Sequence, residues 1–114
     1  MEQIMKNKVM SAQQAVSLIR DGDVVAQAGF IGSSLAETVN KEVEKQFLET
    51  GHPRELTLIF GAGQGSKEGH GCEHFSHEGM IRKVIGGHWA KCPKMGQLAN
   101  DNKIFAYNLF FSFR

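Results

Sequence analysis

The sequence has few of the residues that staple small domains together: two cysteines and two prolines in 114 residues. Cys72 and Cys92 cannot form the multi-bridge framework of a small secreted domain, and we expect both to be free, buried thiols. Thirteen basic and twelve acidic residues nearly cancel, so that the net charge is +1. This balance gives no electrostatic reason to expect binding to nucleic acid or to an anionic membrane.

Long apolar runs are also lacking. No apolar stretch approaches the roughly 20 residues that a membrane-spanning helix needs, and Met1 to Lys6 do not resemble a secretory signal. We therefore expect a cytoplasmic protein. What the sequence does have is 41% apolar residues, in a length suited to one hydrophobic core, so that one domain is the simplest expectation.

One stretch near the amino terminus has the pattern of a turn, a strand, a loop and a helix. Asp21-Gly22-Asp23 predicts the turn, and the apolar run from Val24 to Ala28 predicts a fully buried strand of a parallel sheet. The loop from Gly29 to Gly32 follows, and Ser34 with Glu37 matches a helix capping box. Because open α/β sheets bind ligands between the carboxyl end of a strand and the next helix, we expect a ligand at this loop.

The remaining patterns alternate between helix and strand. Ser11 and Gln14 form a second capping box before a helix of about ten residues, and apolar residues every four positions from Leu35 predict an amphipathic helix that Gly51 ends. The other expected elements are strands over 56–60, 81–85 and 104–107, and short helices over 73–79 and 94–100. This alternation predicts an α/β fold with a mostly parallel sheet and right-handed crossovers. The glycine-rich segment 61–71 is expected to form an ordered loop or a lid.

Three further patterns have two interpretations each. Four residues of metal-binding types lie close together: His70, Cys72, His74 and His77. Their spacing matches no closed zinc pattern, so we favour a solvated, partly helical loop and predict no metal site. Gly61-x-Gly63 after a strand could belong to a dinucleotide-binding loop, but no helix can begin directly after it, so we do not favour that interpretation. His88 and Trp89 are expected to form a packed strand end with a satisfied imidazole rather than a ligand contact.

Several motifs together resemble the family I coenzyme A transferases. In the amino-terminal signature of that family, an Asp-Gly turn and apolar residues lead to Gly-Gly-Phe, and this sequence keeps Asp21, Gly22, Gly29 and Phe30 but has Ala28 for the first glycine. Four later segments resemble the acyl-CoA:acetate/3-ketoacid and propionate branch in the same order: 61–65, 77–79, 84–89 and 93–99. The resemblance extends to about Leu109 and covers nearly the whole chain.

The resemblance implies a three-layer α/β fold of the NagB/RpiA/CoA-transferase type, incomplete in this chain. It implies transfer of CoA from an acyl-CoA to a short-chain carboxylic acid such as acetate or a 3-oxoacid, with CoA as a substrate and no separate cofactor. The glutamate nucleophile of the family has no counterpart here, so we expect no catalytic residue in the chain and little activity from it alone. Residues 1–109 would be the amino-terminal part of the domain, and residues 110–114 an aberrant phenylalanine-rich tail. The missing carboxyl-terminal half or a partner subunit, and a homo-oligomer in the full-length family, are the implied partners.

The same resemblance, together with the glycine content, identifies candidate contacts for the substrate or CoA in two loops. They are Gly29, Phe30, Gly32, Gly61, Ala62, Gly63, Gln64 and Gly65. Glycines let a backbone approach a ligand closely, and the Gln64 amide could donate a hydrogen bond to an acyl oxygen. Alternatively, the glycines only make strand-to-helix turns, and the chain is a non-catalytic α/β domain that binds a partner subunit or a small metabolite.

Overall fold

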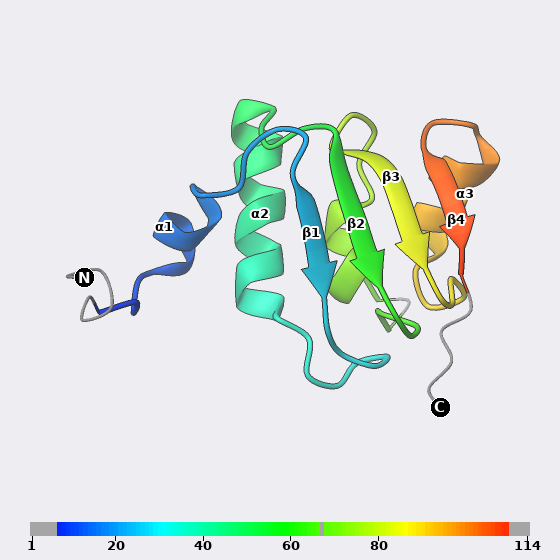
Figure 1. Cartoon of the computed structure of the whole chain (residues 1–114), viewed down its shortest axis with the longest axis horizontal. Coiled ribbons are helices and arrows are strands. Elements are labelled where there is room, and N and C mark those ends of the chain that lie inside the picture. Colours follow the sequence, from blue (N-terminus) through cyan, green and yellow to red (C-terminus); the bar gives the residue numbers. More distant parts are fainter. Residues whose placement is uncertain (1–6, 67, 110–114) are drawn as a thin grey trace.

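The computed structural model describes residues 7–66 and 68–109. Four strands form one parallel sheet in the order β1-β2-β3-β4 (Figure 1). The strands are β1 (Val24–Gln27), β2 (Leu56–Phe60), β3 (Ile81–Gly86) and β4 (Phe105–Asn108). Each strand lies beside its neighbour in sequence, which confirms the predicted parallel α/β fold.

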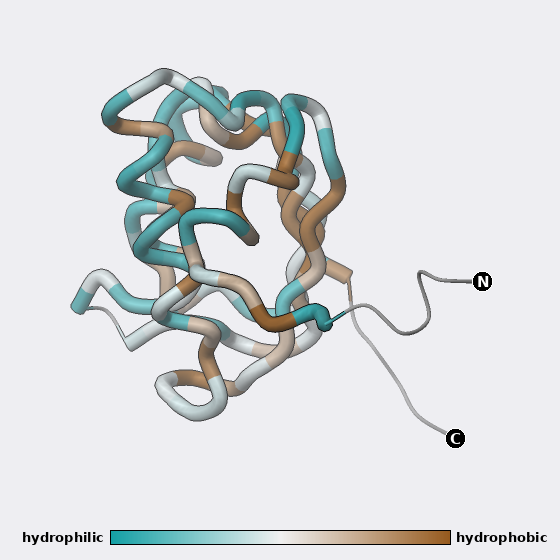
Figure 2. Tube along the Cα trace, turned by 90° about the vertical axis from the view of Figure 1, so that its left-hand side faces the viewer, coloured by the Kyte–Doolittle hydropathy of each residue, from teal (hydrophilic) through white to brown (hydrophobic). Residues whose placement is uncertain are grey.

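The helices lie on one face of this sheet. They are α1 (Ala12–Val16), α2 (Glu37–Thr50), the 3₁₀ helix η2 (Gly71–Phe75) and α3 (Pro93–Asn100). In Figure 1, α2, η2 and α3 lie behind the strands, and in the perpendicular view of Figure 2 the helices and the sheet form separate layers. The described residues therefore make two layers, a sheet and a set of helices. None of the helices described is long and apolar enough to cross a membrane.

The core fills the space between β2, β3 and the helices. Along β2, Leu56, Leu58 and Phe60 are buried in alternation, as expected where every second side chain of a strand points to the same face. Val84 of β3 and Val43 of α2 are buried in the same cluster. This burial of a central strand confirms the prediction made from its continuous apolar run.

The prediction of a fully buried first strand is wrong. β1 is an edge strand that pairs only with β2, and Val24 is 63% exposed. Only Val25 and Gln27 of β1 point toward the helices, and both are half-buried. A short apolar run does not distinguish a central strand from an edge strand, because that difference depends on which strands flank it.

The helix starts agree with prediction at one position and differ at the other. Ser11 Oγ accepts a hydrogen bond from the Gln14 amide at 3.1 Å, which confirms that capping box, although the helix ends at Val16, earlier than predicted. The capping box at Ser34 is wrong. Ser34 has a φ of +59°, and α2 begins after Ala36 without a side-chain cap. The carboxylate of Glu37 bonds η2 instead, as described below.

The face of the sheet opposite the helices carries no helix among the described residues. Strand register places Val24, Thr57, Lys83 and Phe105 in one row across this face, and Ala26, Ile59, Ile85 and Tyr107 in the next. Phe105 is 59% exposed and Tyr107 is 47% exposed. Exposed aromatic and aliphatic side chains therefore gather on one open surface. The expected phenylalanine-rich tail, residues 110–114, lies outside the described residues.

We expect the chain to self-associate through this open face, since large exposed apolar surfaces and unpaired sheet edges promote association. Replacing both Phe105 and Tyr107 by threonine, which keeps β propensity, should lower the weight-average mass measured by sedimentation. Leu48→Gln is the matched control, because Leu48 is 62% exposed but lies on α2. A native chain that sediments as a single monomer at all concentrations would contradict the expectation.

Candidate functional site

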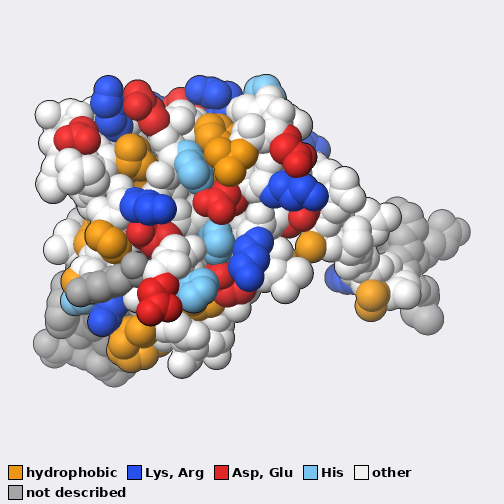
Figure 3. All heavy atoms as spheres, turned by 180° about the vertical axis from the view of Figure 1, so that it is seen from behind, with side chains coloured by type: hydrophobic (Ala, Val, Ile, Leu, Met, Phe, Trp, Pro, Cys, Tyr) orange, Lys and Arg blue, Asp and Glu red, His pale blue; other side chains and the backbone are white. Residues whose placement is uncertain are grey.

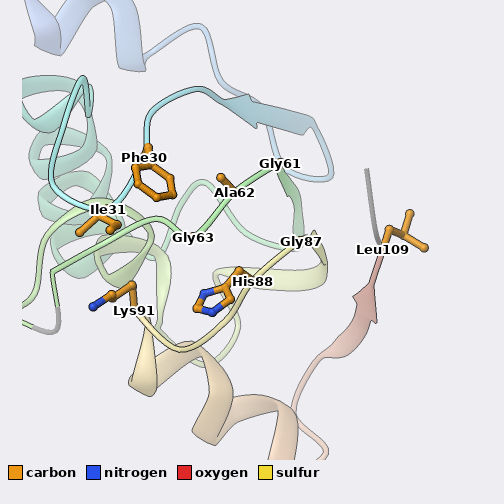
Figure 4. Close-up of a pocket in the computed structure, with 9 residues that line it drawn as sticks. All are labelled: Phe30, Ile31, Gly61, Ala62, Gly63, Gly87, His88, Lys91 and Leu109. Carbon is orange, nitrogen blue, oxygen red and sulfur yellow. The ribbon is translucent and has the colours of Figure 1, made fainter. Parts of the chain in front are cut away.

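A cavity of about 430 Å³ lies at the edge where the carboxyl ends of the parallel strands meet. Three loops build it, one after each of β1, β2 and β3, together with the residue that follows β4 (Figure 4). The lining residues are Phe30, Ile31, Gly61, Ala62, Gly63, Gly87, His88, Lys91 and Leu109. This is the edge at which open α/β sheets bind their ligands.

The two predicted glycine loops are joined directly to each other. The Ile31 amide donates to the Gly63 carbonyl at 2.7 Å, and the Gly65 amide donates to the Ile31 carbonyl at 3.0 Å. Ile31 reaches this position with a φ of +54°, which is unusual for a β-branched residue. Segments that are thirty residues apart in sequence thus share one cavity wall.

The structure brings half of the predicted contact residues to the cavity. Phe30, Gly61, Ala62 and Gly63 line it, whereas Gly29, Gly32, Gln64 and Gly65 do not. Gly29 and Gly65 have φ values of +120° and +111°, and a Cβ on either would crowd neighbouring atoms, so both serve the loop conformation. A contact between ligand and any of these eight residues stays a prediction.

Gln64 is fully buried, and its amide is used within the fold. Its Nε2 donates to the Ala28 carbonyl at 2.5 Å, and its Oε1 accepts from Cys72 Sγ at 3.4 Å. The side chain therefore connects the end of β1 to η2. The proposed donation to an acyl oxygen would require this amide to leave its partners.

Sequence reasoning missed the loop after β3. His88 was expected to be a packed strand end with a satisfied imidazole, but its side chain is exposed at the cavity and makes no hydrogen bond to any described residue. Trp89 is the packed member of the pair, with its ring centroid 6.2 Å from that of Phe60. The position of His88 and Lys91 after the carboxyl end of a central strand is the signal that could have identified them.

His74 and His77 do not lie in a solvated loop, which corrects the prediction, because both bond carboxylates of α2; the predicted partly helical character is confirmed by η2. His74 is buried; its Nε2 lies 2.9 Å from Glu37 Oε2 and its Nδ1 lies 3.1 Å from Glu44 Oε1. His77 Nε2 lies 2.8 Å from Glu44 Oε2. Figure 3, from the helix side, shows histidines and acidic side chains interleaved on this face. Among residues 7–66 and 68–109, no group of three or more potential ligands could hold a metal ion.

These contacts change the acidity of the two glutamates. Burial raises the pKa of Glu37, but hydrogen bonds from the Gly71 amide and His74 outweigh it and hold the pKa below 4.5. The pKa of Glu44 is lowered in the same way, because hydrogen bonds from His77 and His74 outweigh its burial. Burial also raises the pKa of the Cys92 thiol to about 12, and that of Cys72 further, so neither is a thiolate at neutral pH.

Comparison with known proteins identifies relatives of one kind. No protein-family model matches the chain. It is 35% identical over 101 residues to acetate CoA-transferase YdiF of Escherichia coli K12. The matched residues are 88% of this chain and 19% of that protein. It is 31% identical over 102 residues to caffeate CoA-transferase of Acetobacterium woodii, 90% of this chain and 20% of the relative. The chain thus spans about a fifth of the length of these relatives.

Solved structures agree with the sequence matches. The acyl-CoA transferase YdiF apoenzyme of Escherichia coli O157:H7 superposes with a TM-score of 0.86 at 34% identity, over 90% of this chain and 20% of that one. Its thioester complex with CoA gives a TM-score of 0.85 at 33% identity, over 89% of this chain and 21% of that chain. The fold is therefore the α/β fold of an acyl-CoA transferase. Over the residues matched, the chain is homologous to the coenzyme A transferases, as its motifs predicted.

The lowered pKa values predict a loss of stability in acid. A carboxylate whose pKa is lower in the folded state stabilises the fold above its unfolded pKa, and this stabilisation is lost as the pH falls through the folded value. The free energy of unfolding should therefore decrease between about pH 5 and about pH 3. Glu44→Gln should reduce the slope of the free energy of unfolding against pH, measured by urea titrations at a series of pH values. Glu49→Gln should not, because Glu49 is exposed on the same helix and makes no ion pair with a described residue; equal slopes for the two variants would contradict the assignment.

Proposed function

We propose that the chain supplies one wall of the acyl-binding cleft of a CoA-transferase, which moves CoA from an acyl-CoA to a short-chain carboxylic acid such as acetate or a 3-oxoacid. One observation carries the proposal: the cavity joins two glycine loops at the carboxyl edge of a sheet that superposes on the YdiF thioester complex with a TM-score of 0.85. An α/β fold alone would not identify the reaction, but homology in sequence and structure over the same residues supports it.

The proposed reaction divides one difficult transfer into easier steps. An enzyme carboxylate attacks the thioester carbonyl and displaces CoA as its thiolate, which gives a mixed anhydride. The thiolate then attacks the enzyme's carbonyl of that anhydride, which releases the first acid and leaves an enzyme thioester, and the second acid receives CoA by the reverse of these steps. No aspartate or glutamate lines the cavity among the described residues. In this proposal the attacking glutamate belongs to polypeptide other than the described residues. The chain's own part is to place backbone close to the acyl group at positions without a Cβ, of which Gly61 and Gly63 are two.

The partners follow from the same proposal. The cleft is completed by the carboxyl-terminal half of the enzyme or by a partner subunit, and the complete enzyme is a homo-oligomer. CoA acts as a substrate, with no separate cofactor. Residues 1–109 are then the amino-terminal part of the domain. A role in short-chain fatty acid or ketone body metabolism and a cytoplasmic location belong to this proposal as well.

A complementation assay tests the proposed function. The chain alone should not convert an acyl-CoA and acetate to acetyl-CoA, because no carboxylate of residues 7–66 and 68–109 lines its cavity. Adding a polypeptide that contains the remaining four fifths of the homologous transferase should produce acetyl-CoA, measured by chromatography. That polypeptide without the chain is the control. No gain of activity from a complex shown to form would reject the transferase assignment.

One glycine makes the role of the cavity wall testable. A Cβ at Gly87 would collide with the Gly61 carbonyl, whereas a Cβ at Gly96, on α3, would meet no atom within 4 Å. We expect Gly87→Ala to separate the loops after β2 and β3 and to lower the complemented activity by about tenfold or more. Gly96→Ala should keep the activity. Circular dichroism melting curves should show that both variants fold, and equal activities would contradict a cleft at this edge.

The alternative is a non-catalytic α/β domain that binds a partner subunit or a metabolite. The observation that favours it is the absence of an acidic side chain from the lining residues described here. The complementation assay separates the two candidates, since this alternative gives complex formation or ligand binding without turnover.

A further inference from the structure

The cavity walls have an apolar part and a basic part. Phe30, Ile31 and Leu109 supply large apolar side chains, and Phe30 and Leu109 are 59% and 47% exposed. His88 and Lys91 are the only lining residues with titratable side chains, and neither is acidic. An apolar ligand body would remove the exposed side chains from water, and the basic groups favour an anionic head over a cationic one.

His88 is held in a defined position with a free nitrogen. A Cβ at Gly63 would lie 2.9 Å from His88 Nδ1 and 3.6 Å from its Cβ and Cγ, so the ring lies against the bare Gly63 backbone. Nε2 is at the other end of the ring, and Figure 4 shows the imidazole between Ala62 and Lys91. No described residue hydrogen bonds the ring. Nε2 is therefore available to donate to a ligand oxygen.

The size of the cavity bears on which acid it holds. A volume of about 430 Å³ lies within the range of about 300–1,000 Å³ that is typical of pockets for organic ligands. The methyl group of acetate would leave most of the apolar wall in contact with water. An aryl or branched aliphatic group would cover more of this wall, beginning with Phe30 and its neighbour Ile31.

We propose that the cavity selects carboxylic acids with a bulky apolar body over acetate, and that His88 positions the acid by donating from Nε2 to a carboxyl oxygen. Lys91 adds positive charge to the same cavity. This inference rests on the proposed function, because it specifies the acid that the cleft accepts. His88 is a specificity-determining residue here and carries no covalent step.

Binding of three probes to the 114-residue chain tests the inference. The probes are trans-cinnamate, acetate, and cinnamyl alcohol, which keeps the aryl body without the carboxylate. The His88 ring signals in NMR spectra report binding directly. Cinnamate should bind at least about tenfold more tightly than acetate because it buries more apolar surface, and roughly tenfold more tightly than the alcohol because a charged oxygen accepts the hydrogen bond.

Variants separate the hydrogen bond from the shape of the site. His88→Phe keeps a ring but no donor, and should weaken cinnamate binding by roughly tenfold; for this variant the signals of Phe30 and Leu109 report binding. His88→Gln should restore part of the affinity. Gly63→Ala displaces the ring while keeping the imidazole and should also weaken binding, whereas Gly96→Ala should not.

Each contrary result rejects a defined part of the inference. Equal affinity of cinnamate for the native chain and for His88→Phe would overturn the role of His88, and equal affinity of acetate and cinnamate would overturn the selectivity. Neither result decides the complementation assay, which for this purpose is run in parallel with acetate and with cinnamate as the acceptor, because a cleft that selects against acetate could still transfer CoA to cinnamate. Conversely, selective cinnamate binding without any complemented activity would reject the transferase and leave a carboxylate-binding domain.

Discussion

The hydrogen bonds between Ile31 and the loop after β2 are the constraint on which the cavity depends. They fix the position of Gly63, whose missing Cβ leaves the space that the His88 ring occupies. A side chain at position 63 would change both the loop after β2, which contains it, and the loop after β3, which carries His88. The parallel sheet brings the three loops to one edge, but these backbone contacts set the distances between them.

The helical layer is joined to these loops by carboxylates that are partly or fully buried. Glu37 and Glu44 connect α2 to η2 through His74, and the buried Glu73 of η2 accepts hydrogen bonds from the Lys94 and Met95 amides at 3.2 and 3.4 Å. The second set of contacts satisfies amides at the start of α3, which would otherwise have no partner. η2 is thus joined to α2 on one side and to α3 on the other, and its buried polar side chains have partners there.

The elements that the sequence predicted well are those that depend on local pattern. The strand over 56–60, the Gly51 end of α2 and a short helix that begins within one residue of the predicted Lys94 are all properties of a few consecutive residues. The failures involve distant partners. Glu37 bonds Gly71, 34 residues away, and the competing local bond to Ser34 was all that the sequence could show. His88 is similar, since its freedom from hydrogen bonds depends on the loops that surround it.

The open face of the sheet and the chemistry missing from the cavity are two aspects of one incomplete structure. Parallel sheets are ordinarily covered on both faces, because their strands are apolar on both sides, and here the row from Val24 to Phe105 has no cover among the described residues. Leu109 lies at the cavity immediately after β4, beside that face. Polypeptide that packs on the open face next to β4 would therefore also reach the cavity mouth. In the transferase proposed above, one additional segment would bury the exposed aromatics and bring a carboxylate to the acyl group, so that folding of the second layer and assembly of the reactive site would be one event.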